Sequence, residues 1–196
     1  MRREQDHLTR KAKASGYPAR SVHKLIEIQE RFDVLKSGMR VLDLGASPGS
    51  WSLYASRIVG PAGRIVAVDL KNEIVEVLSS PFTFVEGDMH DSAVRSSIRE
   101  LGSYDCILSD AAPSTTGNRT VDTARSEALV DSAIAYCDTC LAAGGNFVVK
   151  LFQGDAVDEV FMSIRNRFST AKRFKPTSSR KSSFEIFCVG IGHNGS

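Results

Sequence analysis

Residues 40–51 decide the fold, and they read RVLDLGASPGSW. The apolar, β-branched run over 40–44 predicts a buried strand, and Gly45 and Gly49 allow a tight turn before a helix that begins at Ser50. A strand that passes through a glycine-containing loop into a helix is the opening of a βαβ unit. The stretch therefore predicts a parallel sheet that carries a ligand loop at the carboxyl end of its first strand.

The same alternation of strand-like and helical runs continues outward from this stretch. Apolar residues at helical spacing from Val22 to Phe32 predict a helix on the amino-terminal side, which Ser37-Gly38 ends. On the other side the strand candidates are Arg64–Leu70, Phe82–Glu86, Tyr104–Leu108 and Asn146–Leu151, and the helical stretches are Ser50–Val59, Ser92–Leu101 and Val121–Leu141. Near-continuous apolar strands that alternate with helices are typical of a parallel sheet covered on both faces.

The last part of the chain breaks this alternation. After a predicted helix over Ala156–Phe168, two runs at Ser169–Phe174 and Phe184–Ile191 have the pattern of a hairpin. We therefore expect a Rossmann-like α/β fold, with a mostly parallel seven-stranded sheet, one antiparallel edge strand, and helices on both faces.

Length and composition limit the classes of protein that the chain can represent. With 196 residues, of which 42% are hydrophobic and 24% charged, the chain suits a single domain over residues 1–196. No apolar run approaches the roughly 18 residues of a membrane helix, and the polar start, MRREQD, lacks the apolar core of a signal peptide. We expect a cytoplasmic protein with no membrane partner.

The net charge of +2 conceals an uneven distribution. Residues 1–24 hold seven Lys/Arg and two acidic residues, residues 165–181 hold seven Lys/Arg and no acidic residue, and the remainder holds 11 basic and 21 acidic residues. Basic ends around an acidic middle favour a nucleic-acid partner, which a basic N-terminal arm over residues 1–20 would contact. Solvated basic surface is the alternative.

Acidic residues follow three successive predicted strands. Asp43 stands beside the glycine loop, where a carboxylate suits the positively charged amino-acid end of a ligand and repels phosphate. Asp69 can accept both hydroxyls of a ribose, and Asp88 can accept an adenine amino group beside the apolar Met89. Together they describe a nucleoside that carries a cation and no phosphate, which is S-adenosylmethionine. Each Asp alone could instead cap the following helix.

Two residues of opposite charge lie at the ends of later strands. Asp110 follows the strand Tyr104–Leu108, and Lys150 lies near the end of the strand Asn146–Leu151. A lysine at the end of an apolar strand is costly to bury unless it pairs with a neighbouring carboxylate. We expect an ion pair there, with a structural role as the alternative to a catalytic one.

At these residues the sequence resembles the FtsJ (also called RrmJ) family of ribose 2'-O-methyltransferases, which is recognised by a Lys-Asp-Lys-Glu tetrad. The matching segments, in the family's order, are Ser21–Leu25 (SVHKL), Ser109–Pro113 (SDAAP), Val149–Phe152 (VKLF) and Ser179–Glu185 (SRKSSFE). The resemblance extends over nearly the whole chain. Departures from the usual residues, at His23, Ser50, Ser114 and Phe187, fall outside the tetrad.

The resemblance implies a class I methyltransferase fold with a shared catalytic site. The catalytic residues would be Lys24, Asp110, Lys150 and Glu185, which converge beside the transferred methyl group and hold the target ribose. The family's cofactor-contacting positions fall on Gly49, Trp51, Asp69, Asp88 and Asp110, with Met89 beside the adenine. With Asp43 and Gly45 of the loop, these are the expected S-adenosylmethionine-binding residues.

The tetrad suggests a role for each member. We expect Lys150 to be the base that takes the proton of the ribose hydroxyl, because a second ammonium group and partial burial favour the neutral amine. Lys24 would supply that second charge and hold the developing alkoxide. Asp110 would orient Lys150 near the cofactor, and Glu185 would position Lys24 or the hydroxyl.

The substrate follows from the resemblance less directly. A chain without an appended RNA-binding module is most similar to the bacterial members that methylate a uridine of 23S rRNA, so we expect a monomeric enzyme that acts on rRNA within the 50S subunit. tRNA and mRNA caps are alternative substrates. Two other classes stay open: a nicotinamide-dependent oxidoreductase, disfavoured by the missing GxGxxG motif, and a non-catalytic ribosome-assembly factor, disfavoured by the complete tetrad.

The cysteines do not indicate a second site. Cys137 and Cys140 have CxxC spacing within a predicted helix, where Cys137 shares the apolar face. A lone CxxC without a second pair or a nearby His is weak evidence for zinc, and we expect no metal.

Overall fold

The computed structural model describes residues 2–74, 79–180 and 183–195. Its helices are α1 (Arg2–Ala14), α2 (Val22–Phe32), α3 (Ser50–Val59), α4 (Ser92–Glu100), α5 (Arg119–Cys140) and α6 (Val157–Arg167). Its strands are β1 (Arg40–Leu44), β2 (Arg64–Asp69), β3 (Phe82–Glu86), β4 (Tyr104–Ser109), β5 (Leu141–Phe152), β6 (Phe168–Phe174) and β7 (Glu185–His193). These elements follow the predicted alternation and end in the predicted hairpin-like pair.

The seven strands form one sheet in the order β3-β2-β1-β4-β5-β7-β6. Strands β1 to β5 are parallel to one another, and β7 runs antiparallel to both of its neighbours, β5 and β6. The predicted fold class is confirmed, and the antiparallel strand is second from its edge of the sheet, which β6 completes. The strand order reverses between β1 and β4, and ligands bind at such a point in folds of this kind.

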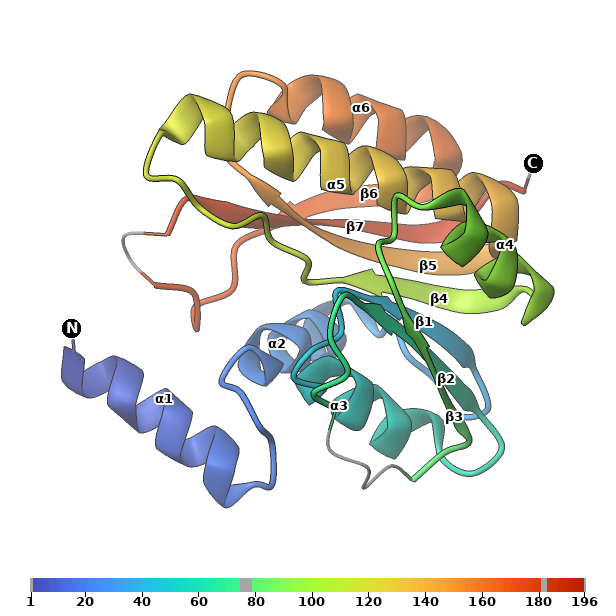
Figure 1. Ribbon diagram of the computed structural model, residues 1–196, viewed down its shortest axis with the longest axis horizontal. Helices are drawn as coiled ribbons and strands as arrows, with labels where there is room; N and C mark the ends of the chain where they lie inside the picture. The colour runs from blue at the N-terminus through green and yellow to red at the C-terminus, as the bar shows by residue number, and fades with distance from the viewer. Residues whose placement is uncertain (1, 75–78, 181–182, 196) are drawn as a thin grey trace.

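Helices cover both faces of the sheet (Figure 1). α4, α5 and α6 pack on one face, and α2 and α3 pack on the other. Within β1, Leu42 and Leu44 belong to the first of these cores and Val41 to the second. Because both faces are covered at the centre of the sheet, β1, β2 and β4 are mostly buried along their length, whereas the edge strand β6 is largely exposed. In the described ranges, no helix is long and apolar enough to cross a membrane.

The basic N-terminal arm predicted over residues 1–20 contains the helix α1, which projects from the body of the molecule (Figure 1). The arm is anchored at its carboxyl-terminal end, where Ala12 and Tyr17 pack with Val22 and Leu53 in a small core of their own. This anchor fixes the point at which the arm leaves the body.

α2 ends at Phe32, before the predicted stop at Ser37-Gly38, because Asp33 adopts a left-handed conformation at the C-cap. Two other elements begin at least two residues earlier than the sequence predicts. α5 begins two residues earlier, because the Asn118 side chain accepts hydrogen bonds from the N–H groups two and three residues further on. β5 begins at Leu141, because Gly144 and Gly145, which interrupt the apolar run in the sequence, are accommodated within the strand. The early start of β5 is supported by Leu141, which pairs with Tyr104 of β4.

Two glycines with similar backbone angles test how tightly the ligand loop is packed. Gly45 ends β1 with φ +73°, and a Cβ there would lie 2.7 Å from Ala111 Cα, whereas Gly38, with φ +81°, has open space around it. We predict that Gly38→Ala lowers the free energy of unfolding by about 1 kcal/mol through backbone strain alone. Gly45→Ala should lower the free energy of unfolding by roughly 1–3 kcal/mol more than Gly38→Ala, because the added methyl group meets the backbone of Ala111. Urea denaturation measures both losses, and equal values would contradict the close approach.

Candidate functional site

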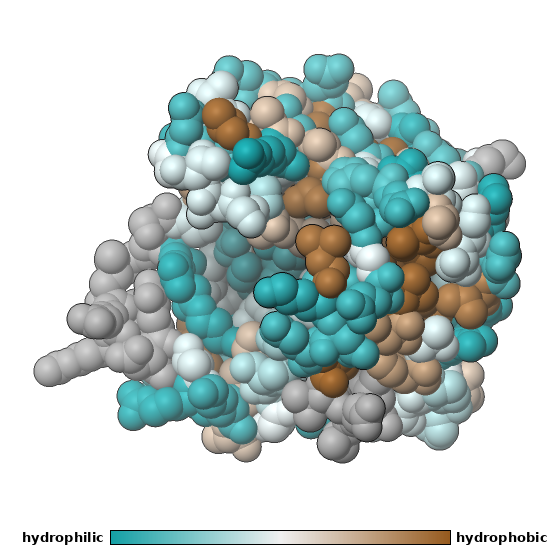
Figure 2. All heavy atoms as spheres, viewed as in Figure 1, coloured by the Kyte–Doolittle hydropathy of each residue, from teal (hydrophilic) through white to brown (hydrophobic). Residues whose placement is uncertain are grey.

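A cleft of about 320 Å³ opens at the carboxyl ends of β1, β2, β3 and β4. Its polar lining consists mainly of the carboxylates of Asp69, Asp88 and Asp110. The remaining lining residues are small or apolar: Gly45, Ser47, Val68, Leu70, Gly87, Met89, Ala111, Ala112 and Leu129. Figure 2 shows a hollow near the centre of this face of the molecule, with hydrophilic residues around it.

The loop after β1 forms one wall of the cleft and is fastened to Asp69. The Ser47 N–H donates a 2.9 Å hydrogen bond to Asp69 Oδ2, and the Lys71 N–H donates one of 3.2 Å to Asp69 Oδ1. Leu70, the residue that follows Asp69, is 65% exposed and lines the same cleft. The carboxylate predicted to accept ribose hydroxyls is therefore held in one orientation beside an open apolar surface.

Asp43 lies behind the loop and does not line the cleft. Its side chain is 1% exposed and accepts a 2.6 Å hydrogen bond from the Ser52 hydroxyl of α3. Burial, aided by the Asp110 and Asp69 carboxylates, raises the pKa of Asp43 to about 7, although the Ser52 bond acts in the opposite direction. Its predicted contact with the amino-acid end of a cofactor stays a prediction, and the buried charge favours a cation nearby.

Gly49 and Trp51, also expected in the cofactor site, face other parts of the structure. Gly49 caps α3 with φ +96°, and a Cβ there would lie 2.9 Å from the Ile74 side chain. Trp51 is buried: its indole N–H donates to the Ser21 carbonyl at 3.0 Å, and its ring centroid lies 5.8 Å from that of Phe187. The Trp51 side chain thus fills the interface between helix and sheet and anchors the segment that precedes α2.

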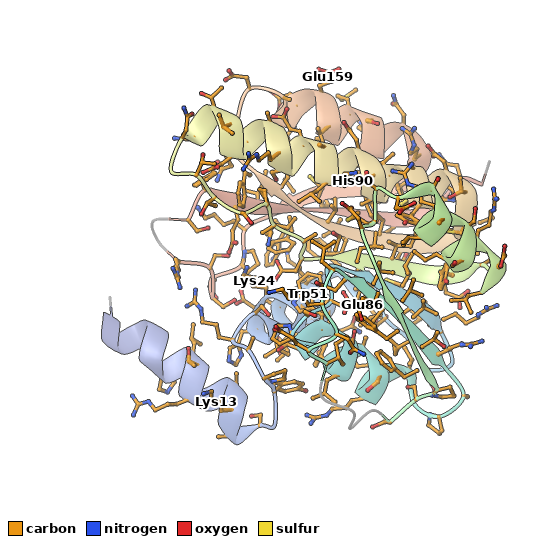
Figure 3. All side chains as sticks on the ribbon, viewed as in Figure 1. Lys13, Lys24, Trp51, Glu86, His90 and Glu159 are labelled. Atoms are coloured by element: carbon orange, nitrogen blue, oxygen red, sulfur yellow. The ribbon has the colours of Figure 1, made fainter. Side chains whose placement is uncertain are left out.

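Four charged side chains from four parts of the chain meet beside the cleft: Lys24 of α2, Asp110 after β4, Lys150 of β5 and Glu185 of β7. Lys150 Nζ lies 3.0 Å from Asp110 Oδ1 and donates a 2.6 Å hydrogen bond to the Asp110 carbonyl oxygen. Lys24 Nζ lies 3.5 Å from the same Oδ1 and 3.0 Å from Glu185 Oε2. The structure therefore brings together all four residues of the predicted tetrad, and Figure 3 shows Lys24 close to Trp51 at the centre of the molecule.

The register of the sheet explains this meeting. Ser109 pairs with Val149, so the residues that follow them, Asp110 and Lys150, lie side by side at the ends of two parallel strands. β7 is antiparallel, so it begins where the parallel strands end, and its first residue, Glu185, lies opposite the last residue of β5. The reversal of one strand is what brings an acidic residue to this edge.

The electrostatics of the cluster rest on two ammonium groups balanced by two carboxylates. Burial alone would raise the pKa of Glu185, but the Lys24 ammonium and hydrogen bonds from Lys24 and Ser179 hold that pKa below its usual value. Among the described residues, none donates a well-directed hydrogen bond to the buried Asp110 Oδ1, so charge attraction holds it in place.

Glu27, a carboxylate that the sequence did not single out, supports the outer side of the cluster. It lies one turn after Lys24 on α2 and accepts a 2.8 Å hydrogen bond from the Ser178 N–H. The next residue, Ser179, donates its hydroxyl to Glu185 Oε1 at 3.0 Å. The Glu27 side chain of α2 therefore holds the segment before β7, and Lys24 of the same helix pairs with Glu185, the first residue of β7. The helical spacing from Lys24 marks Glu27 as a neighbour but does not reveal its partner.

Five apolar residues of the cleft were also missed: Val68, Leu70, Ala111, Ala112 and Leu129. Leu70 and Ala111 directly follow acidic residues at strand ends, and this position is a signal that could have found them. Leu129 lies within α5, where nothing in the sequence distinguishes it from a core residue.

Comparison with known proteins shows what the chain resembles. The sequence model of the FtsJ-like methyltransferase family matches residues 17–193. Two relatives carry the name ribosomal RNA large subunit methyltransferase E. The one from Treponema denticola is 46% identical over 192 residues, which covers 98% of this chain and 96% of the relative. The one from Nitratidesulfovibrio vulgaris (strain DP4) is 47% identical over 197 residues, which covers 100% of this chain and 96% of the relative.

Among solved structures, a Plasmodium falciparum protein described as a ribosomal RNA methyltransferase is 26% identical and has a TM-score of 0.78. The match covers 92% of this chain and 100% of that one. The likeness therefore extends through the sheet and the helices that carry the cluster.

Asp43→Asn tests the buried carboxylate. The pKa of Asp43 is raised on folding from an ordinary 3.8 to about 7, so the protonated form stabilises the folded state, and this stability is lost as the pH rises through that window. From pH 5 to pH 8 the parent should lose about 2–3 kcal/mol of unfolding free energy that Asp43→Asn, which has no carboxyl group to titrate there, should keep. Urea denaturation at both pH values measures this, and parallel pH dependence in the two proteins would contradict it.

Proposed function

The chain belongs to the FtsJ-like methyltransferase family, and on that premise we propose that it uses S-adenosylmethionine to methylate the 2'-hydroxyl of a ribose in large-subunit ribosomal RNA. The observation that carries the proposal is the cluster of two lysines and two carboxylates beside an acidic cleft. Asp110 belongs to both, so the cofactor and the target hydroxyl would meet at one residue.

S-adenosylmethionine is the cofactor, and the cleft suits it. Three carboxylates and no lysine or arginine stand among the described residues that line the cleft, which favours a cationic nucleoside over a ligand with phosphates. A volume of about 320 Å³ is in the range of small-molecule sites. When bound, the cofactor supplies a methyl group on a positively charged sulfur.

Each part of the cofactor has proposed partners in this chain. Asp69 would accept the ribose hydroxyls, Asp88 would accept the adenine amino group beside Met89, and Asp110 would lie near the sulfonium. The rest of the proposed set consists of Asp43, Gly45, Gly49 and Trp51, of which Gly45 lines the cleft. For Asp43 the contribution would be charge through the loop, since its side chain is buried.

The four charged residues divide the work at the ribose. Lys150 Nζ is placed by two contacts with Asp110, to the carboxylate and to the main-chain carbonyl. As a neutral amine it would take the proton of the hydroxyl while the hydroxyl oxygen bonds to the methyl group, which leaves the sulfur. Lys24 Nζ lies 3.5 Å from the same Asp110 oxygen, so the two lysines share one carboxylate oxygen. Lys24 is itself held by Glu185 and stabilises the developing alkoxide.

The RNA part of the proposal is supported by the relatives' names and by charge. Both relatives are named for the RNA of the large ribosomal subunit. α1 carries basic residues, and Lys13 points away from the body of the molecule (Figure 3), where it could reach phosphates beside the target. We propose that a uridine of 23S rRNA within the 50S subunit is the target. The chain would act in the cytoplasm as a monomer, with one domain over residues 1–196 and no metal.

The substrate class is tested by incubating the parent protein with labelled S-adenosylmethionine and, separately, 50S subunits, free 23S rRNA, tRNA and capped RNA, each from a source without the modification. We expect label in the 50S subunits above the other three. Label confined to tRNA or to capped RNA would overturn the choice of ribosomal RNA while leaving a methyltransferase.

Lys150→Ala should remove the proposed base and leave the cofactor cleft intact. We expect methyl transfer to fall by about 10²–10⁴-fold, with unchanged affinity for S-adenosylhomocysteine in a calorimetric titration. Lys36→Ala, which removes an exposed lysine outside both basic ends of the chain, is the matched control and should retain activity. A Lys150→Ala protein as active as the parent would refute the base assignment.

Replacing the basic residues of the arm should weaken RNA binding. The variant changes Arg2, Arg3, Arg10, Lys11 and Lys13 to Gln. A plot of log K for RNA binding against log salt concentration has a negative slope, and each lost phosphate contact should make that slope shallower by about 0.7–0.9. Lys36→Gln with Arg99→Gln, at the opposite end of the sheet, is the control. An arm variant with the parent's affinity and salt slope would show that the arm does not contact RNA.

A further inference from the structure

Two helices behind the cleft hold the turn that follows β3, which contributes Asp88 and Met89 to the cleft lining. The Met89 carbonyl oxygen accepts a 3.2 Å hydrogen bond from Arg95 Nε and one of 3.0 Å from the Tyr136 hydroxyl. Arg95 comes from α4 and Tyr136 from α5. One carbonyl group of the cleft wall is therefore fixed from two directions.

The same peptide unit is held at its other end by Asp88. The His90 N–H, which shares a peptide bond with the Met89 carbonyl, donates a 2.9 Å hydrogen bond to Asp88 Oδ1. A peptide unit is planar and rigid, so donors that fix the carbonyl also fix the direction of the N–H. Arg95 and Tyr136 thus act, through one peptide unit, on the carboxylate that lines the cleft. In the part of the chain that the structure describes, Asp88 Oδ2 accepts no hydrogen bond and is left for a ligand.

The two donors have little freedom of their own. Arg95 Nη2 donates to Ser132 Oγ at 3.1 Å, and that hydroxyl lies 2.6 Å from His90 Nδ1, which closes a ring of contacts around the turn. Figure 3 shows His90 beside α5. Tyr136 is 2% exposed, and burial raises the pKa of its phenol to about 12, so the hydroxyl keeps its proton and remains a donor.

We propose that Arg95 and Tyr136 are positioning residues that orient the Asp88 carboxylate, and that they thereby set the preference of the cleft for adenine over hypoxanthine. The inference rests on the proposed function, in which Asp88 accepts a hydrogen bond from the adenine amino group. Hypoxanthine carries a carbonyl oxygen in place of that amino group, so a carboxylate held in one direction accepts from adenine and repels hypoxanthine. A carboxylate that can rotate away discriminates less.

Tyr136→Phe and Arg95→Met each remove one donor to the Met89 carbonyl and keep most of the side-chain volume. S-adenosylhomocysteine and S-inosylhomocysteine, which carries hypoxanthine, are titrated calorimetrically into the full chain. We expect the preference for S-adenosylhomocysteine to fall about fivefold in each single variant and further in the double variant. The kcat at saturating S-adenosylmethionine should stay at the parent's value, because the catalytic cluster is untouched.

Two control variants separate orientation from stability. The Tyr104 hydroxyl donates a 2.9 Å hydrogen bond to the Ile98 carbonyl, away from the cleft, and Tyr104 is 1% exposed, so Tyr104→Phe loses an equivalent buried bond. Arg99→Met removes an exposed charge one turn after Arg95 on α4. Both controls should keep the parent's preference for S-adenosylhomocysteine, even where the thermal midpoint falls as far as in Tyr136→Phe.

The outcomes separate this inference from the function on which it rests. A double variant with the parent's preference, or a Tyr104→Phe control that loses the preference equally, would overturn the positioning role while the parent still transfers methyl groups. A parent that binds both compounds equally would overturn the role of Asp88 in reading the base. A parent that binds neither compound would overturn the cofactor assignment, and the inference with it.

Discussion

The carboxylate of Asp110 lies between two ammonium groups, and the rest of the site depends on that arrangement. Lys150 is 6% exposed, and a charge buried to this extent is strongly destabilising without a partner. Asp110 supplies the partner, but its Oδ1 also lies 3.5 Å from Lys24, which takes a second anion, Glu185, at 3.0 Å. The charge of Lys150 is therefore balanced within a cluster to which three other parts of the chain contribute.

Only the edge where the parallel strands end can satisfy that requirement. β4 and β5 bring Asp110 and Lys150 to adjacent positions, and β7, because it is reversed, begins with Glu185 at the same edge. The indole N–H of Trp51 holds the backbone just before α2, which places Lys24. Asp110 also lines the cleft, so the geometry that balances the charges places the proposed acceptor site next to the proposed cofactor site.

Much of this was predictable from the sequence, and the exceptions have physical causes. β1 and α3 have the predicted bounds, because a continuous apolar run and the glycines of the loop mark their ends. The start of α5 depends on the side chain of Asn118, which caps the helix. Several nearby residues are of types that can also cap a helix, so the sequence does not show which one does. The positions of the acidic residues at the ends of successive strands could be predicted from the order of the strands in the sequence. The burial of Asp43 could not, because it depends on how α3 packs over its side chain. Glu27 and Arg95 act on backbone groups of other elements, and no periodicity encodes such contacts.

Identification of the nucleoside that receives the methyl group tests the central claim most directly. 50S subunits without the modification are incubated with the protein and S-adenosylmethionine, and the rRNA is digested to nucleosides for mass spectrometry. The account predicts one new product, 2'-O-methyluridine, with the added mass on the ribose fragment. A methyl group on a base fragment, or no methylated nucleoside from subunits that bind the protein, would contradict the account.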